Sequence, residues 1–334
     1  MFADTLLAWY EENRRTLPWR GETNPYKIWV SEIILQQTRV QQGWDYYLRF
    51  IETFPDVASL ARAPEEQVLR VWQGLGYYSR ARNMHAAAQQ IMDLHKGKFP
   101  SQYEDIRQLK GIGDYTAAAI ASIAFKLPYP AVDGNVLRIC SRIFGIHDDI
   151  MLPVTRKQIT DICRKHIPHN NPGDFNQACM EFGAVWCTPK NPKCDDCPFA
   201  SQCYALKHDV VEMLPVKSNK ITKRERYFHY NFYIYNNSTV IEKRTGNDIW
   251  RNLYQFPMQE YPTDAEFPNQ DNSTKVREIL THQIIYATFQ IQQLNKMPVL
   301  GKHQLLVPLD RLHEYPMPKI MVDFLRPIIQ NQDR

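Results

Sequence analysis

The sequence of 334 residues has no long apolar run, no internal repeat and no low-complexity segment. No stretch approaches the ~18 consecutive apolar residues of a membrane-spanning helix, and the apolar run near the N-terminus is too short and too acidic for a signal peptide. Charge of one sign does not dominate, because the net charge is only +4. These absences predict a cytoplasmic protein without a membrane segment, whose thiols are reduced or metal-bound rather than paired in disulfides.

The composition is ample for packed cores. Hydrophobic residues make up 44% of the chain, and the length suggests two domains. The mildly basic charge is compatible with binding to nucleic acid but does not require it. Apolar spacing and few breakers predict helices at residues 5–15, 28–50, 65–73, 80–96, 103–109, 115–125, 161–167 and 174–186.

A short glycine loop, Gly111-Ile112-Gly113, separates the helices predicted at residues 103–109 and 115–125. Glycine permits positive φ and close backbone approach, so the pattern fits a tight helix-to-helix hairpin. The amides of this loop and of the second helix's first turn can hold an anion such as a DNA phosphate. A lone GxG is most often a plain turn. Here Asp133-Gly134-Asn135 follows twenty residues after Gly113, and that combination is much less common.

Two further stretches have both a functional and a structural interpretation. Glu32 lies in an apolar segment, where it is either solvated on the far face or set in a pocket. The loop Gly74–Arg82 contains two glycines, two tyrosines and two arginines. It suits contact with a nucleic-acid backbone, with one aromatic ring free to enter the base stack. The alternative is a structural turn whose tyrosines belong to the core.

Seven cysteines occur, and four of them are spaced as Cys187-x6-Cys194-x2-Cys197-x5-Cys203. Four such thiolates can hold a zinc ion or an iron–sulfur cluster. Zinc sites favour two paired CxxC knuckles, and this uneven spacing does not provide two. The remaining cysteines lie in apolar helical stretches and are expected to be small core residues: Cys140, Cys163 and Cys179.

The pattern changes after residue 216. Residues 217–226 hold five basic residues and no apolar run, which predicts a linker. From residue 227 the sequence is rich in β-formers that alternate with polar residues, which predicts strands joined in a hairpin at Asn236-Asn237. A helix is expected at residues 273–280, near the isolated pair Arg277-Glu278.

The glycine loop followed by Asp133-Gly134-Asn135 resembles the helix-hairpin-helix DNA glycosylases of the endonuclease III superfamily. Within that superfamily, SEIILQQT at residues 31–38 and GLGYY at residues 74–78 resemble the MutY-type adenine DNA glycosylases. The cysteine spacing matches the [4Fe–4S] loop of these families, and residues 241–257 resemble the C-terminal domain of MutY proteins. The resemblance spans nearly the whole chain and is strongest from residue 17 to 203.

This resemblance implies an α+β protein. Residues 1–216 would form an all-α helix-hairpin-helix glycosylase domain. Its C-terminal loop would hold a [4Fe–4S] cluster through Cys187, Cys194, Cys197 and Cys203. After the basic linker at 217–226, residues 227–334 would form an α+β Nudix-like (MutT-like) lesion-recognition domain. The Nudix metal-binding signature, a glycine followed by REUxEE, is absent. The second domain is therefore expected to bind rather than to hydrolyse.

The resemblance also implies the chemistry. Glu32 would protonate the leaving adenine, while Asp133, with Asn135 beside it, would stay ionised and face the positive charge that develops on the sugar. Bifunctional members attack the sugar with a lysine, and the matching position here is Tyr115. That substitution predicts a monofunctional glycosylase that uses water.

Other positions are carried over from the family one by one. Gln37 and Tyr77 would fill or wedge the gap that the extruded base leaves, and Gly111 and Gly113 would hold the DNA backbone. The pocket for the extruded base would be lined by Leu17, Trp19, Arg20, Gln177 and Met180.

One departure concerns the second domain. Family members usually carry a Phe-Ser-His loop that recognises 8-oxoguanine. The alignment places Ile284, Ile285 and Tyr286 at that loop, with His282 just before it. His282, Ile285 and Tyr286 are thus the expected lesion-recognition residues, and the usual serine hydroxyl is missing.

The sequence therefore predicts a monofunctional DNA glycosylase of base excision repair that removes adenine opposite 8-oxoguanine or guanine after base flipping. Its partner would be double-stranded DNA with such a mispair, and the protein is expected to act as a monomer at the nucleoid. An endonuclease III-like glycosylase and abasic-site lyase is the alternative enzyme, disfavoured by Tyr115 and by the second domain. A non-catalytic DNA-damage binding protein is the alternative of another class, disfavoured because both Glu32 and Asp133 are present.

Overall fold

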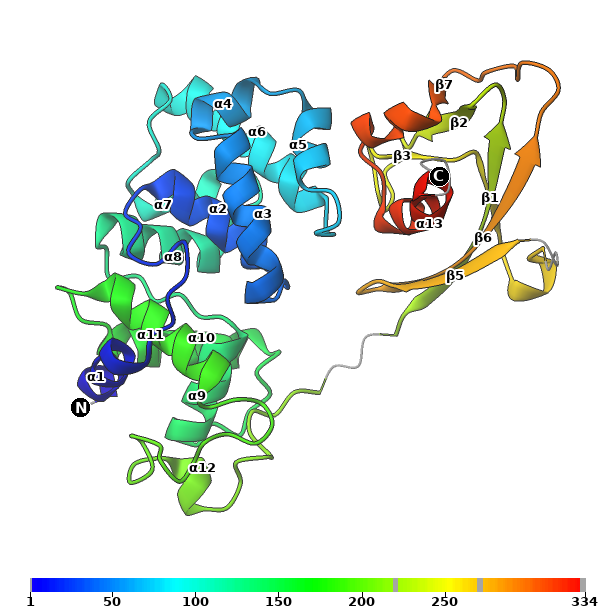
Figure 1. Ribbon diagram of the computed structural model, residues 1–334. Coiled ribbons are helices and arrows are strands. Elements are labelled where there is room, and N and C mark those ends of the chain that lie inside the picture. The colour runs from blue at the N-terminus through cyan, green and yellow to red at the C-terminus, as the bar shows by residue number, and fades with distance from the viewer. Residues whose placement is uncertain (1, 219–221, 269–272, 331–334) are drawn as a thin grey trace. The chain divides into compact units, whose positions relative to one another are not determined.

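The computed structural model describes residues 2–218, 222–268 and 273–330, and helices dominate the first part of the chain while strands dominate the last (Figure 1). The chain divides into two compact units. The first consists of Met1–Arg62 with Asn83–Asn219, and the second of Ala63–Arg82 with Lys220–Arg334. In the described part of the chain, no helix is both long and apolar enough to cross a bilayer.

The first unit is all-helical. One apolar cluster of this unit is built by α1, α9, α10 and α11 around the fully buried Phe175, Phe182 and Phe199. Burying an aromatic side chain of this size contributes roughly 1.5–3 kcal/mol. The helices of this unit are α1 (Phe2–Asn13), α2 (Pro25–Leu35), α3 (Val40–Thr53), α4 (Val57–Arg62), most of α6 (Ser79–His95), α7 (Tyr103–Gln108), α8 (Asp114–Phe125), α9 (Gly134–Phe144), α10 (Pro153–His166), α11 (Pro172–Val185) and α12 (Tyr204–Lys207).

Helix α8 lies at the centre of this unit, against α2, α7 and α11 (Figure 1). Every residue from Thr116 to Ile123 is buried, because small alanines let the neighbouring helices approach from all sides. The same helix begins at the glycine loop and ends at Lys126, which adopts a left-handed conformation with φ of 58°. The predicted helix-hairpin-helix is therefore formed by α7, Gly111–Gly113 and α8.

The prediction of one continuous helix over residues 28–50 is wrong. Helix α2 ends at Leu35, and Gln37 adopts a left-handed φ of 56° before α3 begins at Val40. Helix α3 then folds back against α2, and a Cβ atom on Gly43 would lie 2.9 Å from Leu35 Cδ2. The missing side chain of Gly43 permits this close approach. In addition, α10 begins at Pro153, eight residues before the helix predicted at 161–167.

The second unit is built on two sheets. One has the strand order β4-β1-β6-β5 and the other β3-β2-β7, and β1 and β6 run parallel. Helix α13 (Lys319–Gln330) packs on them, since Phe324 stacks on Phe289 with ring centroids 4.2 Å apart. The strands are β1 (Arg224–Ile234), β2 (Ser238–Lys243), β3 (Tyr254–Gln255), β4 (Met258–Tyr261), β5 (Thr274–Ile279), β6 (Gln283–Gln293) and β7 (Gln304–Pro308), with short 3-10 helices at Asp264–Glu266 and Leu309–Glu314.

Helix α5 (Glu65–Val71) and the loop after it belong to this second unit. Glu66 pairs with Lys243 at 2.6 Å and accepts a hydrogen bond from the Tyr254 hydroxyl at 2.9 Å. The Tyr78 hydroxyl donates to the Met317 carbonyl at 3.1 Å. These contacts hold the GLGYY loop against the β-rich part of the chain.

The predicted hairpin turn at Asn236-Asn237 is confirmed, because Tyr235 and Ser238 exchange two backbone hydrogen bonds of 2.9 Å across it. Beyond this turn, β1 and β2 continue in different sheets. Two other expectations for this unit need correction. Residues 274–279 form strand β5 instead of a helix, because they pair in antiparallel register with β6. Strand β1 begins at Arg224, inside the predicted linker 217–226, of which residues 219–221 lie outside the described residues.

Candidate active site

A cavity of about 510 Å³ opens in the first unit, between α2, α8, α9 and α11. It brings together residues that are far apart in the chain, from Arg15 to Ala184. All of the residues predicted for catalysis and for the base pocket line it, and so does Gln37: Leu17, Trp19, Arg20, Glu32, Gln37, Tyr115, Asp133, Asn135, Gln177 and Met180.

Glu32 projects from α2 into this cavity. Its Oε2 lies 2.8 Å from the Tyr115 hydroxyl. Burial raises the pKa of Glu32, and the nearby charge of Asp133 raises it further, while the hydrogen bond from Tyr115 and the charge of Arg20 oppose the rise. A carboxyl group with a raised pKa holds its proton at higher pH and can act as a general acid.

The Tyr115 hydroxyl has two neighbours that accept hydrogen bonds. Met180 Sδ lies 2.9 Å from it, in addition to Glu32 Oε2. One hydroxyl carries one proton and can donate to only one of them at a time. An ionised Glu32 accepts from Tyr115, and a protonated Glu32 can instead donate to the Tyr115 oxygen while the tyrosine proton turns to Met180. The geometry therefore accommodates Glu32 in both protonation states.

Asp133 is the N-cap of α9 and adjoins the same cavity. Its Oδ1 accepts from the backbone N–H groups of Asn135 and Val136, both at 2.9 Å, and its Oδ2 accepts from Asn135 Nδ2 at 2.8 Å. Burial raises the pKa of Asp133, against the effect of these three donors. Because all three neighbours donate, the negative charge of the carboxylate is stabilised in place.

The far wall of the cavity is held by a carboxylate that the sequence analysis missed. Glu181, on α11, pairs with Arg15 at 2.5 Å and with Arg20 at 2.7 Å. Burial works against its charge, yet the hydrogen bond from Arg15 holds the pKa of Glu181 below its ordinary value. Arg20 in turn donates to the Gln177 amide oxygen. The Gln177 amide nitrogen therefore points away from Arg20. The spacing of Gln177 and Glu181, one helical turn apart, was the available signal.

Arg138 is a second residue that the sequence analysis missed. It donates to Asn135 Oδ1 at 2.8 Å and to the carbonyl oxygens of Gly183 and Cys187 at 2.6 and 2.9 Å. The chain of contacts Asp133–Asn135–Arg138–Cys187 thus connects the cavity to the cysteine loop. No local motif points to it, because two of its three partners, Gly183 and Cys187, are 45 and 49 residues away in the sequence.

The four spaced cysteines line one small cavity whose other walls are largely apolar, including Phe182 and Phe199. Arg142 approaches Cys187 Sγ at 3.4 Å. A [4Fe–4S] cluster is held by four thiolates, one on each iron, and all four cysteines border this one cavity. The cysteine loop therefore fits a cluster.

The two glycines of the glycine loop differ in the space around them. A Cβ atom on Gly111, whose φ is 78°, would lie 2.6 Å from Asn83 Cβ, so glycine is required there. Gly113 is the N-cap of α8, has no side-chain cap, and would meet nothing within 4 Å. The first N–H groups of α8 are thus accessible to an anion.

Tyr77 lies in a separate cavity of about 430 Å³ within the second unit. Its backbone adopts a left-handed φ of 49° and its side chain is 45% exposed. The hydroxyl groups of Tyr77 and Thr281 are hydrogen-bonded. Thr281 was not predicted. Strained conformations of this kind persist where the surrounding structure enforces them.

Of the expected lesion-recognition residues, only His282 lines this cavity. Ile285 is 0% exposed and points into the core of the second unit. Tyr286 stacks on Tyr227 and donates to Glu225 at 3.0 Å, on another face of the sheet. Ile285 and Tyr286 therefore do not line this cavity, and their role in lesion recognition stays a prediction. The cavity presents Leu280, Thr281 and His282 instead.

Comparison with known families supports the helical part. Residues 30–169 match the HhH-GPD superfamily of base excision DNA repair proteins, and residues 187–203 match the iron–sulfur binding domain of endonuclease III. The second match confirms the [4Fe–4S] loop predicted at Cys187, Cys194, Cys197 and Cys203.

Curated relatives are similar over much of the chain. The adenine DNA glycosylase of Buchnera aphidicola subsp. Baizongia pistaciae is 36% identical over 319 residues, which cover 91% of this chain and 89% of the relative. That of Buchnera aphidicola subsp. Schizaphis graminum is 38% identical over 258 residues, covering 77% and 74%. The human adenine DNA glycosylase is 40% identical over 222 residues, covering 64% and 41%.

Solved structures confirm the predicted glycosylase fold. A thermostable thymine-DNA glycosylase superposes with a TM-score of 0.58 and 27% identity, covering 62% of this chain and 95% of that protein. A trapped covalent intermediate of endonuclease III with DNA has a TM-score of 0.53 and 21% identity, covering 62% and 94%. The overlap in each case is limited to about the helical share of the chain.

Proposed function

This chain belongs to the adenine DNA glycosylases, and from that premise we propose that it removes adenine paired with 8-oxoguanine or guanine from double-stranded DNA. The reaction breaks the bond between adenine and C1′ of its deoxyribose, and water supplies the hydroxyl group that replaces the base. The observation that supports this proposal most strongly is the single cavity shared by Glu32 and Asp133.

Glu32 is the general acid of this mechanism. Departure of adenine as an anion is slow, so a proton must reach a ring nitrogen while the bond to the sugar breaks. Glu32 holds a proton because burial raises its pKa. Trp19 and Gln177 line the same cavity and would surround the flipped base.

Asp133 stabilises the sugar. As the base leaves, positive charge develops on C1′ and the ring oxygen, and a fixed carboxylate nearby lowers the energy of that transition state. The three N–H donors around Asp133 keep its carboxylate oriented without a rearrangement during the reaction. Water then completes the hydrolysis, because Tyr115 occupies the position at which a lysine would attack the sugar.

DNA is held at two places. The open N-terminus of α8 behind Gly113 is suited to a backbone phosphate. Gln37, left-handed at the end of α2 and lining the active-site cavity, is placed to fill the space of the flipped adenine. The [4Fe–4S] cluster, when bound by the four cysteines, would rigidly support the cysteine loop and Arg138, which contacts that loop.

The base opposite adenine is read by the second unit. Tyr77 presents an exposed ring that can wedge between bases, and its hydroxyl is fixed by Thr281. Thr281 supplies a hydroxyl group and His282 an exposed imidazole in the same cavity. Together they can hydrogen-bond the edge that distinguishes 8-oxoguanine from guanine. We expect the protein to act as a monomer, in the cytoplasm at the nucleoid.

The experiment that tests this proposal incubates the purified protein with duplexes that contain A:8-oxoguanine, A:G or thymine glycol. Release of adenine from the first two, with strand breaks only after alkali, is the expected result. Processing of thymine glycol, or strand breaks without alkali, would instead indicate an endonuclease III-like lyase.

A further inference from the structure

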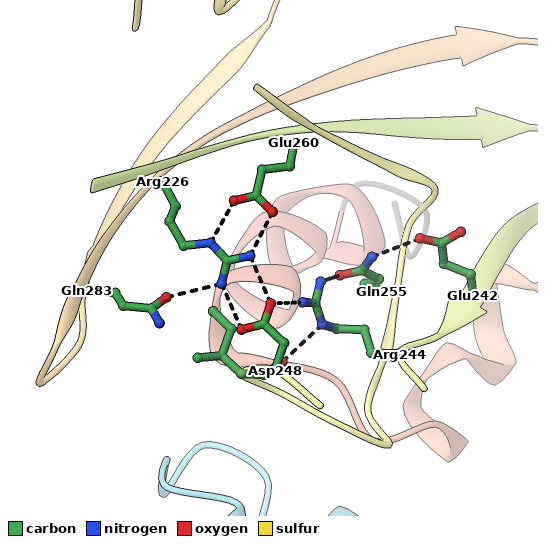
Figure 2. A network of polar contacts seen from close by, with 8 residues as sticks. Arg226, Glu242, Arg244, Asp248, Gln255, Glu260 and Gln283 are labelled. Carbon is green, nitrogen blue, oxygen red and sulfur yellow. Dashed lines mark hydrogen bonds and ion pairs between the residues drawn. The ribbon is translucent and has the colours of Figure 1, made fainter. Parts of the chain in front are cut away.

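A network of charged side chains lies beside the cavity of Tyr77 and Thr281 (Figure 2). At its centre is Arg226 of β1, which is only 6% exposed. Asp248 accepts from both of its terminal nitrogens at 2.9 and 2.8 Å, and Glu260 accepts from Nε and Nη2 at 2.8 and 2.7 Å. Two carboxylates bound in this bidentate way fix the guanidinium plane.

Arg226 also fixes the side chain of Gln283, the first residue of β6. Its Nη1 lies 3.2 Å from the Gln283 amide oxygen. A guanidinium group can only donate, so the oxygen of the amide must face Arg226 and the nitrogen must face away. Figure 2 shows the Gln283 nitrogen turned from the arginine. Among the described residues, none accepts a hydrogen bond from that nitrogen, and Gln283 lines the cavity.

Asp248 lines the same cavity and binds the same Arg226 nitrogen, Nη1, as Gln283 does. Its Oδ2 accepts from Arg226 and from Arg244, its Oδ1 accepts from Arg226, and the backbone N–H of Ile249 also favours the charged form of this carboxyl and lowers its pKa. A carboxylate oxygen can accept two hydrogen bonds, so Oδ1 has capacity for one more. The cavity is thus bordered by a fixed donor on Gln283 and a fixed acceptor on Asp248.

We propose that Gln283, oriented by Arg226, is a specificity-determining residue that donates a hydrogen bond to the base opposite the adenine, with Asp248 as the accompanying acceptor. This inference rests on the proposed function and names the groups that carry its selectivity. 8-Oxoguanine differs from guanine by a carbonyl oxygen at C8 and a hydrogen on N7. Guanine has a bare acceptor at N7.

The donor–acceptor pair matches the lesion. The Gln283 amide N–H pairs with the C8 oxygen, and Asp248 accepts from N7–H. Guanine lacks both features, and its N7 lone pair would face the Asp248 carboxylate without a proton between them. The pair therefore favours 8-oxoguanine and disfavours guanine, which is selectivity by attraction and repulsion together.

The test compares single-turnover adenine release from A:8-oxoguanine and A:G duplexes for wild type, Gln283→Met and Gln283→Glu. Glutamate keeps an oxygen that can accept from Arg226 but removes the N–H donor. This variant therefore separates recognition of the base by Gln283 from the structural role of Gln283 in the Arg226 network. We expect the ratio of the two rates to fall about threefold to tenfold in both variants, the size of one hydrogen bond. Gln292→Met, on the same strand, should leave the ratio unchanged. With 8-bromoguanine opposite adenine, which lacks the C8 oxygen and the N7 hydrogen, both Gln283 variants should match wild type.

A wild-type ratio in Gln283→Glu, or an equal loss of rate on both duplexes, would overturn the inference while leaving the proposed function intact. Wild-type protein that releases adenine equally from both duplexes would instead refute lesion reading altogether. These two failures are distinguished by the wild-type measurement alone.

Discussion

Arg138 offers the sharpest prediction for the first unit, because it connects the active site to the cysteine loop. We consider Arg138→Met, which keeps the aliphatic length and removes every donor. The guanidinium group makes three hydrogen bonds, to Asn135 Oδ1 and to the carbonyl oxygens of Gly183 and Cys187. Arg138 itself is 8% exposed, so water cannot readily replace it.

The expected magnitude follows from these contacts. A hydrogen bond to a charged group contributes about 1.5–3 kcal/mol, but burying the arginine has its own cost. We therefore expect a net loss of about 3–5 kcal/mol in the free energy of unfolding, typical of removing one partner from a buried charged network. For a unit of this size that corresponds to a fall in Tm of roughly 6–20 °C. Release of Asn135 also frees the side chain that orients Asp133, and misplacement of this kind can lower a rate ~100-fold.

The assay measures three quantities on Arg138→Met and on a control, Arg164→Met. These are Tm, iron per chain, and the single-turnover rate of adenine release corrected for iron-loaded protein. Arg164 forms an exposed ion pair with Asp161, worth at most about 1 kcal/mol, so its variant should behave as wild type. An Arg138→Met protein with wild-type Tm and wild-type rate would show that the contacts from Asn135 to Cys187 carry no energy.

Three further predictions concern the active site. Adenine release should fall as pH rises through the raised pKa of Glu32, because only the protonated carboxyl group can act as an acid. The tyrosine hydrogen bond lowers this pKa, so Tyr115→Phe should move the decline to higher pH. A pH–rate profile that shifts to lower pH in this variant would contradict the assignment. Borohydride should trap no covalent protein–DNA adduct with wild type, whereas Tyr115→Lys should yield some; efficient trapping by wild type would rule out hydrolysis by water. In Gly183→Ala the new Cβ would lie 2.6 Å from Asn135 Cβ, so the single-turnover rate should fall roughly 10- to 100-fold, and an unchanged rate would mean that α11 can shift without disturbing Asp133.

Local motifs correctly indicated which residues line the active-site cavity. Each of Glu32, Tyr115 and Asp133 belongs to a short segment with its own pattern, and all three line one cavity. What the sequence did not reveal is long-range pairing. Glu181 and Arg138 are ordinary charged residues on helices until their partners, 166 and 49 residues away, are known. Their importance comes from burial and from contacts that no local periodicity encodes.

The errors have separate physical causes. The break at Gln37 depends on a left-handed conformation of a residue other than glycine, which composition does not indicate. Strand β5 was mistaken for a helix because its two apolar residues, Val276 and Ile279, are three positions apart, which is helical spacing, and pairing with β6 overrides that pattern. The hydrogen bond between Tyr77 and Thr281 joins residues 204 positions apart, so no local pattern could have pointed to Thr281.

The central claim is that Glu32 and Asp133 together cleave the bond between adenine and its sugar. The most direct measurement is single-turnover adenine release from an A:8-oxoguanine duplex by wild type, Glu32→Gln and Asp133→Asn, with binding to the uncleaved duplex measured in parallel. Because both groups act on the transition state, each variant should bind with nearly wild-type affinity and release essentially no adenine. A variant that binds normally and releases adenine near the wild-type rate would contradict the role assigned to that residue.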